Sequence, residues 1–339
     1  MSVKKIVNTA VIGVGNWGKN LVRNFAELSN SNLIACCDLD EKKLEKIKKS
    51  FPKVSVTKNV NDVLRDPEID AIIVATSAST HFKMAKKCLL SGKHVFVEKP
   101  LCLHVKDVNE LNKIAKEKNK KIMVGHLLEY HPAVNYLKDF IKSGKLGDIY
   151  YIYSQRVNLG KIRDDENALW SLAPHDISVI LYLLNEEPVS VAARGEYYLQ
   201  KDLEDVVFLN LQFKDKKMAN IHLSWLDPHK IRKITVVGNK KMVVFDDMEA
   251  TEKIKIYDKG ADPKGKYVSY EESITLRNGD ILIPSFTLKE PLKLECQHFL
   301  DCIIKNKKPL SDGYDGLRVV RVLEAARKSL KKNGVPVRL

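Results

Sequence analysis

The sequence lacks several features that would assign it to a specialised class of protein. None of its six cysteines forms a Cys-x-x-Cys pair, so we expect free thiols in a reducing compartment and no metal site. Its apolar runs are far shorter than the roughly 18 residues needed to cross a membrane. Its N-terminus shows no cleavage site of the signal-peptide type. We therefore expect a cytoplasmic protein without membrane contact.

Acidic residues are fewer than basic ones, 43 against 57, which gives a formal net charge of +14. Many lysines lie on the polar faces expected for amphipathic helices, as in residues 41–49 and 113–121. No arginine-rich stripe, zinc finger or aromatic RNA-binding motif accompanies them. The charge therefore indicates attraction of a small anionic substrate, and we do not expect nucleic-acid binding.

A length of 339 residues, 44% of them hydrophobic, suits about two globular domains. In residues 1–125, short β-branched segments alternate with amphipathic helical patterns. Segment 71–75 is apolar on both faces, as expected for a strand whose sheet is covered by helices on both sides. The pattern predicts an N-terminal α/β domain with a doubly wound, parallel Rossmann sheet. Its expected strands are 9–14, 33–38, 54–57, 71–75, 94–98 and 122–125.

Residues 126–339 are assigned to a second domain because successive β-type segments there follow one another without intervening helices. Polar connections between them predict an α+β domain with an open, mostly antiparallel sheet. One helix is expected at 172–184. Two more close the chain at 292–305 and 316–332, and the last of these is expected to pack back on the first domain. Residues 262–266 are expected to form a mobile loop. The expected strands are 149–157, 189–198, 206–213, 218–225, 233–237 and 241–245.

A glycine-rich segment directly follows the first expected strand and opens a helix that should extend to about residue 28. It has the Gly-x-Gly-x-x-Gly spacing of the dinucleotide fingerprint. Gly13 would make the tight turn, Gly15 would let the backbone approach a pyrophosphate, and Gly18 would let helix and strand pack closely. Backbone N–H groups at the helix N-terminus would then bind the pyrophosphate. The expected contacts are Gly13, Gly15, Asn16, Trp17 and Gly18.

Asp38 ends the second expected strand, twenty residues after Gly18. A carboxylate at this place accepts hydrogen bonds from a ribose 2′-hydroxyl and repels a 2′-phosphate. Residues 39–41 contain no arginine that would hold such a phosphate. The sequence therefore predicts NAD rather than NADP as the cofactor.

Two further strand ends place polar groups at the carboxyl edge of the sheet, where ligands of doubly wound folds bind. The fourth strand leads into Thr76, Ser77 and His81, which we expect near the cofactor. The fifth delivers Glu98 and Lys99, followed by a proline, and both residues are expected to bind the cofactor. Desolvation beside the cofactor would lower the pKa of Lys99 toward a range that is useful for proton transfer.

The chain resembles the glucose–fructose oxidoreductase/inositol dehydrogenase (Gfo/Idh/MocA) family over nearly its whole length. The resemblance rests on residues 13–18, on Asp38 and above all on Glu98-Lys99-Pro100. It implies an NAD(P)-dependent dehydrogenase that acts on a CH–OH group of a sugar or cyclitol. It also implies that the open sheet of the second domain supports a homodimer or homotetramer.

The second catalytic element of that family is a histidine at the start of a helix in the second domain, commonly preceded four residues earlier by aspartate. His175 matches the histidine, whereas Ser171 takes the place of the aspartate. Asp176 is adjacent but is expected to point elsewhere on the helix. Lys99 and His175 are the expected catalytic pair: one takes the proton of the substrate hydroxyl and the other stabilises the oxyanion. Either residue could be the base.

Residues 125–134 and 154–170 are similar to the UDP-N-acetylglucosamine 3-dehydrogenases of this family, and less closely to dehydrogenases of UDP-N-acetylglucosaminuronate. Such enzymes oxidise C3 so that an aminotransferase can install an amine there. Arginines would supply cations for the two phosphates, and aromatic rings could cover uracil or sugar. The expected substrate-binding residues are His126, Tyr130, Arg156, Asn158, Arg163, Trp170 and His175.

Other interpretations stay open. Arg156 and Asn158 could simply decorate a strand, and His126 could be a buried histidine at a strand end. The substrate could be inositol or a monosaccharide. A different class of function would be NAD-dependent glycoside hydrolysis, for which we identify no placed carboxylate pair, or non-catalytic NAD sensing, against which the presence of Lys99 and His175 argues.

Overall fold

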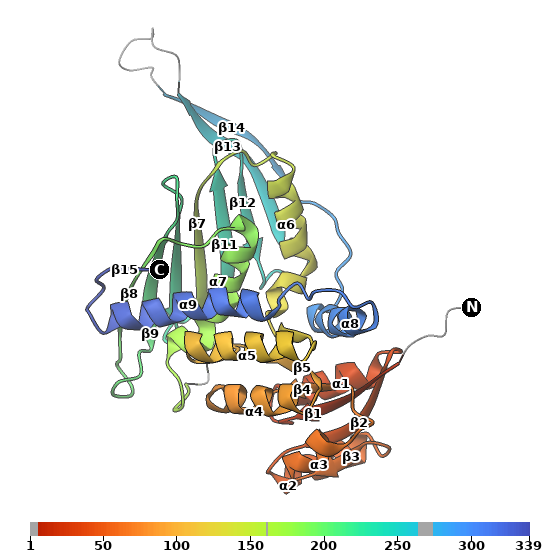
Figure 1. The fold of residues 1–339 in the computed structure, drawn as a ribbon. Helices are drawn as coiled ribbons and strands as arrows, with labels where there is room; N and C mark the ends of the chain where they lie inside the picture. The colour runs from red at the N-terminus through yellow and green to blue at the C-terminus, as the bar shows by residue number, and fades with distance from the viewer. Residues whose placement is uncertain (1–5, 161, 264–273) are drawn as a thin grey trace. The chain divides into compact units, whose positions relative to one another are not determined.

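The computed structural model describes residues 6–160, 162–263 and 274–339 (Figure 1). They form two compact units. The first holds the described residues up to Tyr130 together with Lys289–Arg321, and the second holds His131–Leu288 and Val322–Leu339. The sequence prediction divided the chain at 125/126 and gave every later residue to the second domain. It also expected the last helix to pack back on the first domain, but it did not anticipate that residues 289–312, before that helix, belong to the first unit.

The first unit is built on six parallel strands in the order β3-β2-β1-β4-β5-β6. This order confirms the predicted doubly wound Rossmann sheet, in which the chain starts at the centre and winds outward in both directions. The carboxyl ends of the strands therefore lie along one edge. The strands are β1 (Val7–Ile12), β2 (Ser31–Cys37), β3 (Ser55–Thr57), β4 (Ala71–Val74), β5 (His94–Val97) and β6 (Ile122–Val124).

Helices cover both faces of this sheet, which explains why its strands are apolar throughout. On one face, α1 (Gly18–Glu27), α2 (Glu41–Ser50) and α8 (Pro291–Ile304) share a buried cluster with the strands. The rings of Phe25, Phe96 and Phe299 meet edge to face there. The other face packs against α3 (Val60–Arg65), α4 (Ala78–Leu90), α5 (Val105–Glu117) and the first turns of α9 (Gly313–Leu330).

The second unit contains a nine-stranded sheet in the order β14-β13-β12-β11-β7-β10-β9-β8-β15. Among the described strands, only β7 and β10 pair in parallel, so the predicted mostly antiparallel sheet is confirmed. The strands are β7 (Ile149–Val157), β8 (Ser190–Glu196), β9 (Val206–Gln212), β10 (Met218–Ser224), β11 (Ile231–Gly238), β12 (Met242–Asp246), β13 (Ile254–Pro263), β14 (Ile274–Leu282) and β15 (Val337–Arg338).

Two helices, α6 (Pro132–Lys142) and α7 (Ala168–Leu184), pack on one face of this sheet. The prediction started α7 four residues too late. The helix begins earlier because Asn167 caps it, its side-chain oxygen accepting the N–H of Trp170 at 3.1 Å. Pro174 therefore lies inside the helix. At the other end, the Lys138 ammonium on α6 donates to the carbonyls of Tyr182 and Leu183.

The sequence prediction missed helix α6 and strands β13, β14 and β15 of this unit. Strands β13 and β14 form an antiparallel pair at the edge of the sheet. The predicted mobile loop at 262–266 overlaps the end of β13, and its residues 264–266 lie outside the described part of the chain. Within the described ranges, no helix is both long enough and apolar enough to span a bilayer.

Candidate active site

The glycine-rich turn between β1 and α1 has the conformation that a dinucleotide fingerprint requires. Gly13 adopts a φ of +90°, and a Cβ there would lie 2.6 Å from the carbonyl oxygen of Ala75. A Cβ on Gly18 would lie 1.9 Å from the carbonyl oxygen of Gly13. Around Gly15, by contrast, no described atom comes within 4 Å of the Cβ position. The backbone at Gly15 is thus open for the approach of a ligand.

The N-terminus of α1 is arranged to receive an anion. Its first turn leaves backbone N–H groups without partners inside the helix and carries a partial positive charge. Trp17 is at the N-cap and makes no capping hydrogen bond with its side chain to any described residue, and the first turn contains no acidic residue. Together with Gly15 and Asn16 in the turn, these groups fit a pyrophosphate.

Asp38 lies just beyond β2 and is fixed against this turn. Its Oδ2 accepts the N–H of Val14 at 2.8 Å and its Oδ1 accepts the N–H of Asp40 at 3.0 Å. Sequence reasoning missed Lys43, whose ammonium lies 3.7 Å from Asp38. The clue was its place in the first turns of α2, the helix that follows Asp38. The ammonium of Lys43 partly neutralises the Asp38 carboxylate, so a substituent on the ribose would meet less negative charge there.

The residues after β4 divide into two kinds. Thr76 and Ser77 precede α4 at the carboxyl edge of the sheet, and the Thr80 hydroxyl donates to the Thr76 hydroxyl at 2.7 Å. His81, in contrast, is 1% exposed. Its ring nitrogens lie 2.8 Å from the carbonyl oxygen of Pro100 and 3.0 Å from that of Thr76. The structure therefore gives His81 a role in joining two loops of the edge.

The segment after β5 carries Glu98 and Lys99, and a cis peptide bond links Lys99 to Pro100. The Trp17 indole donates to Glu98 Oε1 at 2.6 Å, and the backbone N–H of Lys99 donates to Glu98 Oε2 at 3.2 Å. Burial raises the pKa of Glu98 to about 7, although both donors favour its charged form. Glu98 thus joins the glycine-rich turn to the Lys99 segment.

His126, predicted to contact substrate, is instead buried in the first unit with 2% of its surface exposed. Its Nδ1 lies 2.6 Å from Asp315 and 3.3 Å from Glu129. Burial opposes the imidazolium, but the two carboxylates raise the pKa of His126 to about 10. These three residues could form a metal-ligand set. However, 2.6 Å is a hydrogen-bond distance and is shorter than the separation of about 3 Å between two zinc ligands.

Tyr130, the second aromatic residue expected at the substrate, is also buried. It lies in the 3₁₀ helix η1 (Leu127–Tyr130), and its hydroxyl is 2.8 Å from the Ser311 hydroxyl. Sequence reasoning could not find these partners because Ser311 and Asp315 lie more than 180 residues further along the chain.

In the second unit, β7 and α7 carry the predicted substrate residues. His175 is partly exposed on α7, and Ser171 lies one turn earlier on the same helix. Asp176 does point elsewhere: it accepts hydrogen bonds from Ser154 at 2.5 Å and from Arg156 Nε at 2.5 Å. Arg156 is 6% exposed, so its guanidinium is committed largely to Asp176 rather than to a ligand.

The other predicted groups of this unit lie near the loop after β7. Arg163 forms ion pairs with Asp165 at 3.2 Å and with Glu166 at 2.9 Å. Asn158 follows β7 directly and is partly exposed. Trp170 is buried on α7, where the Arg327 guanidinium lies 5.6 Å from its ring centre. Both arginines expected to bind phosphate are thus paired with carboxylates.

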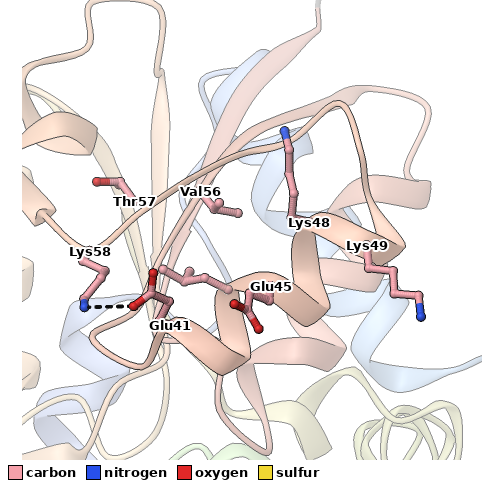
Figure 2. Close-up of a pocket in the computed structure, with 8 residues that line it drawn as sticks. Glu41, Glu45, Lys48, Lys49, Val56, Thr57 and Lys58 are labelled. Carbon is pink, nitrogen blue, oxygen red and sulfur yellow. Dashed lines mark ion pairs between the residues drawn. The ribbon is translucent and has the colours of Figure 1, made fainter.

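A depression of about 620 Å³ lies between α2 and β3 (Figure 2). Its lining combines lysine and glutamate side chains with Leu44, Val56 and Thr57, and Glu41 pairs with Lys58 at 3.5 Å. Its described lining contains no residue predicted for the cofactor or the substrate. We assign it no role in the site.

Comparison with known proteins supports the predicted resemblance. Residues 7–126 match the family described as "Oxidoreductase family, NAD-binding Rossmann fold", and residues 134–244 match the "GFO/IDH/MocA C-terminal domain". The chain is 26% identical to the NAD-dependent scyllo-inositol 2-dehydrogenase of Bacillus subtilis, over 98% of this chain and 96% of the relative.

A second relative has a different substrate. The UDP-N-acetylglucosamine 3-dehydrogenase of Acidithiobacillus ferrooxidans is 26% identical over 93% of this chain and 94% of its own. Its solved structure aligns over 96% of this chain and 98% of its own, with a TM-score of 0.80 and 23% identity. The structural likeness establishes a shared fold.

Proposed function

The chain belongs to the Gfo/Idh/MocA family of NAD-binding oxidoreductases, and on this premise we propose that it oxidises C3 of UDP-N-acetylglucosamine to the 3-keto sugar. The observation that supports this choice most directly is the similarity to a curated 3-dehydrogenase over more than nine-tenths of both chains. The glycine-rich turn, the N-terminus of α1 and Asp38 are the groups that would hold the cofactor. When bound, NAD supplies the hydride acceptor.

The residues of this chain would handle the proton. Oxidation of the alcohol removes a hydride from carbon and a proton from the hydroxyl oxygen. We propose that Lys99 and His175 serve this one hydroxyl, with one accepting the proton and the other donating a hydrogen bond to the developing oxyanion. Ser171 offers a hydroxyl where the family commonly has aspartate. The imidazole therefore has no carboxylate at that position to orient it.

A second candidate substrate is an inositol. It is favoured by the pairing of Arg156 with Asp176 and of Arg163 with Asp165 and Glu166, because paired arginines offer little net positive charge to a diphosphate. The similarity to scyllo-inositol 2-dehydrogenase points the same way. UDP-N-acetylglucosaminuronate is the remaining sugar-nucleotide alternative. The partner enzyme of the 3-keto product would be an aminotransferase.

The test is to incubate the full chain with NAD and a panel of alcohols and to follow NADH absorbance. We expect NADH with UDP-N-acetylglucosamine and none with myo- or scyllo-inositol. NADH with inositol alone would replace the proposed substrate. Release of UDP or free sugar without net NADH would indicate hydrolysis, and NAD binding without turnover on any compound would indicate a sensor.

We further propose that the open face of the second sheet binds a second copy of the chain, giving a homodimer or homotetramer. Aromatic side chains are exposed there: Tyr151 at 41%, Tyr153 at 39% and Phe208 at 46%. Residues on β9 alternate between buried and exposed, so the described residues leave one face of the sheet uncovered. A cytoplasmic location is also proposed, supported by six buried cysteines that are all free thiols in the described structure.

We expect Phe208→Lys to shift the protein toward the monomer in light scattering, because a cation on this face cannot be buried without a partner. Leu90→Lys is the matched control, since Leu90 is 51% exposed on α4 of the other unit. Equal masses for wild type and Phe208→Lys would contradict the proposed interface.

A further inference from the structure

The Glu98 carboxylate joins three segments of the first unit that are far apart in sequence. One oxygen accepts the indole N–H of Trp17 at 2.6 Å, and the other accepts the backbone N–H of Lys99 at 3.2 Å. The second oxygen also lies against the end of β6, where a Cβ on Gly125 would approach it to 3.0 Å. No larger residue fits at Gly125 without displacing the carboxylate, so this junction is closely packed.

The charged groups facing Glu98 come from every neighbouring element. Lys99 follows it in the chain and His126 follows β6; both favour its anionic form. On α8, Glu295 lies close enough that the charge of Glu98 raises the pKa of Glu295. Glu295 is itself 1% exposed, and its Oε1 has no hydrogen-bond partner among the described residues. Burial raises the pKa of Glu98 to about 7, so the carboxyl group changes between its protonated and its charged form near neutral pH.

We propose that Glu98 is a positioning residue whose charged form holds the glycine-rich turn in the conformation that binds the dinucleotide, which makes NAD binding pH-dependent. Trp17 is the residue directly before α1, so its indole fixes the end of the turn that presents N–H groups to the pyrophosphate. The same carboxylate holds the backbone of Lys99. The effect of Glu98 on the position of Lys99 matters for catalysis only if the proposed function is correct. The effect of Glu98 on NAD affinity does not depend on the proposed function.

The physical reason lies in what a carboxylate loses on protonation. The anion accepts two N–H groups, one on each oxygen, and hydrogen bonds to a charged acceptor are roughly twice as strong as neutral ones. When one oxygen gains a proton it becomes a donor, so one of the two N–H groups faces a poorer acceptor. The turn then loses part of its anchor, and N–H groups are presented to the pyrophosphate less often.

The test measures NAD affinity by calorimetry on the full chain between pH 6 and pH 8, independently of turnover. For wild type we expect the Kd to increase at least about fivefold from pH 8 to pH 6, as expected if a charge-assisted hydrogen bond weakens to a neutral one. The midpoint should lie near pH 7. A flat profile in wild type, or tighter binding at pH 6, would overturn the proposal.

Two variants and one control separate this role from a general effect on folding. Glu98→Gln keeps the shape but has no charge to lose, so its Kd should be weak and independent of pH. Trp17→Phe removes the donor through which the carboxylate holds the turn, so its Kd should be weak and should vary much less with pH than that of wild type. Glu110→Gln, which removes an exposed carboxylate paired with Lys86, should match wild type. If Glu98→Gln keeps the wild-type profile, the proposal is wrong.

Circular dichroism at each pH establishes that the variants are folded. If Glu98→Gln does not fold, Trp17→Phe alone decides, because a wild-type pH dependence of the Kd in that variant contradicts the proposal. If the substrate panel gives no NADH, these measurements of NAD binding still stand. The proposed function and the role of Glu98 can therefore be refuted independently.

Discussion

Single side chains carry the proposed chemistry, and Lys99 and His175 are the two whose loss should stop it. We expect Lys99→Ala and His175→Ala each to lower kcat by at least about a hundredfold, because each would remove a group that holds or transfers the alcohol proton. NAD affinity should stay within a few-fold of wild type. Steady-state kinetics and calorimetric NAD titration on the same preparations provide both measurements.

Rates within a few-fold of wild type in both variants would contradict the catalytic assignment. Ser171→Asp is an informative companion, since it restores the carboxylate that the family commonly has at this position. If the imidazole is oriented by the residue one turn earlier on α7, this variant should change the pH profile of kcat and leave NAD affinity unchanged.

Asp38 should determine the choice between NAD and NADP. In Asp38→Ala we expect NAD to bind more weakly and the preference over NADP to narrow by at least about tenfold, because the ribose hydroxyl loses a charged acceptor. Lys43 would then lie near the ribose without its carboxylate partner, which adds attraction for a 2′-phosphate. Comparing kcat/KM for the two cofactors measures the change; an unaltered ratio would exclude this role.

The role of a site residue could be predicted from the sequence where the local backbone geometry determines that role. Gly13 and Gly18 are required by close approaches of backbone within one β–turn–α unit, and the spacing of the motif encodes that unit. His126 and Tyr130 were placed at the substrate because they follow a strand end. Their burial depends on Asp315 and Ser311, whose approach is set by how the chain returns to the first unit.

At the scale of elements, α7 is attached to β7 by a buried ion pair next to His175. Asp176 is fully buried and bonds both Arg156 and Ser154. We expect Asp176→Ala to lower the free energy of unfolding of the second unit by about 3–5 kcal/mol, because it leaves the Arg156 guanidinium buried without its partner. Urea unfolding followed by the fluorescence of Trp170 and Trp225 measures this loss.

Asp139→Ala on the exposed side of α6 is the matched control and should change stability by less than about 0.5 kcal/mol. A similarly small effect of Asp176→Ala would mean that the ion pair makes no net contribution to the free energy of unfolding. The double variant Asp176→Ala/Arg156→Met should recover part of the loss, because it no longer buries an unpaired charge.

Sequence patterns located most elements and both ends of β7, but they missed the ends of several others. The alternating pattern of β9 is visible in the sequence because every second residue is buried. The early start of α7 was missed because Pro174 discourages a helix, whereas the cap supplied by Asn167 overrides it. Strands β13 and β14 were missed because, as an edge pair, they expose many side chains and carry little of the apolar signal that marks a central strand.

For the molecule as a whole, the buried group of His126, Glu129 and Asp315 predicts a loss of stability at alkaline pH. Asp315 and Glu129 raise the pKa of His126 to about 10 against burial, while burial and Asp315 raise that of Glu129 to about 8. The folded protein therefore binds more protons than the unfolded chain between these values and the ordinary ones near 6.5 and 4.3. Stability should fall as pH rises through this window.

We expect the unfolding midpoint of the first unit to decrease by at least about 4 °C between pH 6.5 and pH 10. Differential scanning calorimetry at constant ionic strength measures it. His126→Gln should reduce the slope with pH, and His229→Gln, which alters an exposed histidine, should leave it unchanged. A midpoint that rises toward pH 10 would contradict the charge states inferred for this group.

The return of α8 to the first unit constrains how the protein can be made. Leu292, Cys296 and Phe299 complete the buried cluster around Phe25 and Phe96, yet they are translated about 170 residues after β6. While the ribosome synthesises the second unit, the part of this sheet face that α8 will cover stays exposed. A nascent chain stalled before residue 291 would therefore present an apolar surface to chaperones, and the cofactor domain can mature only after α8 has been translated.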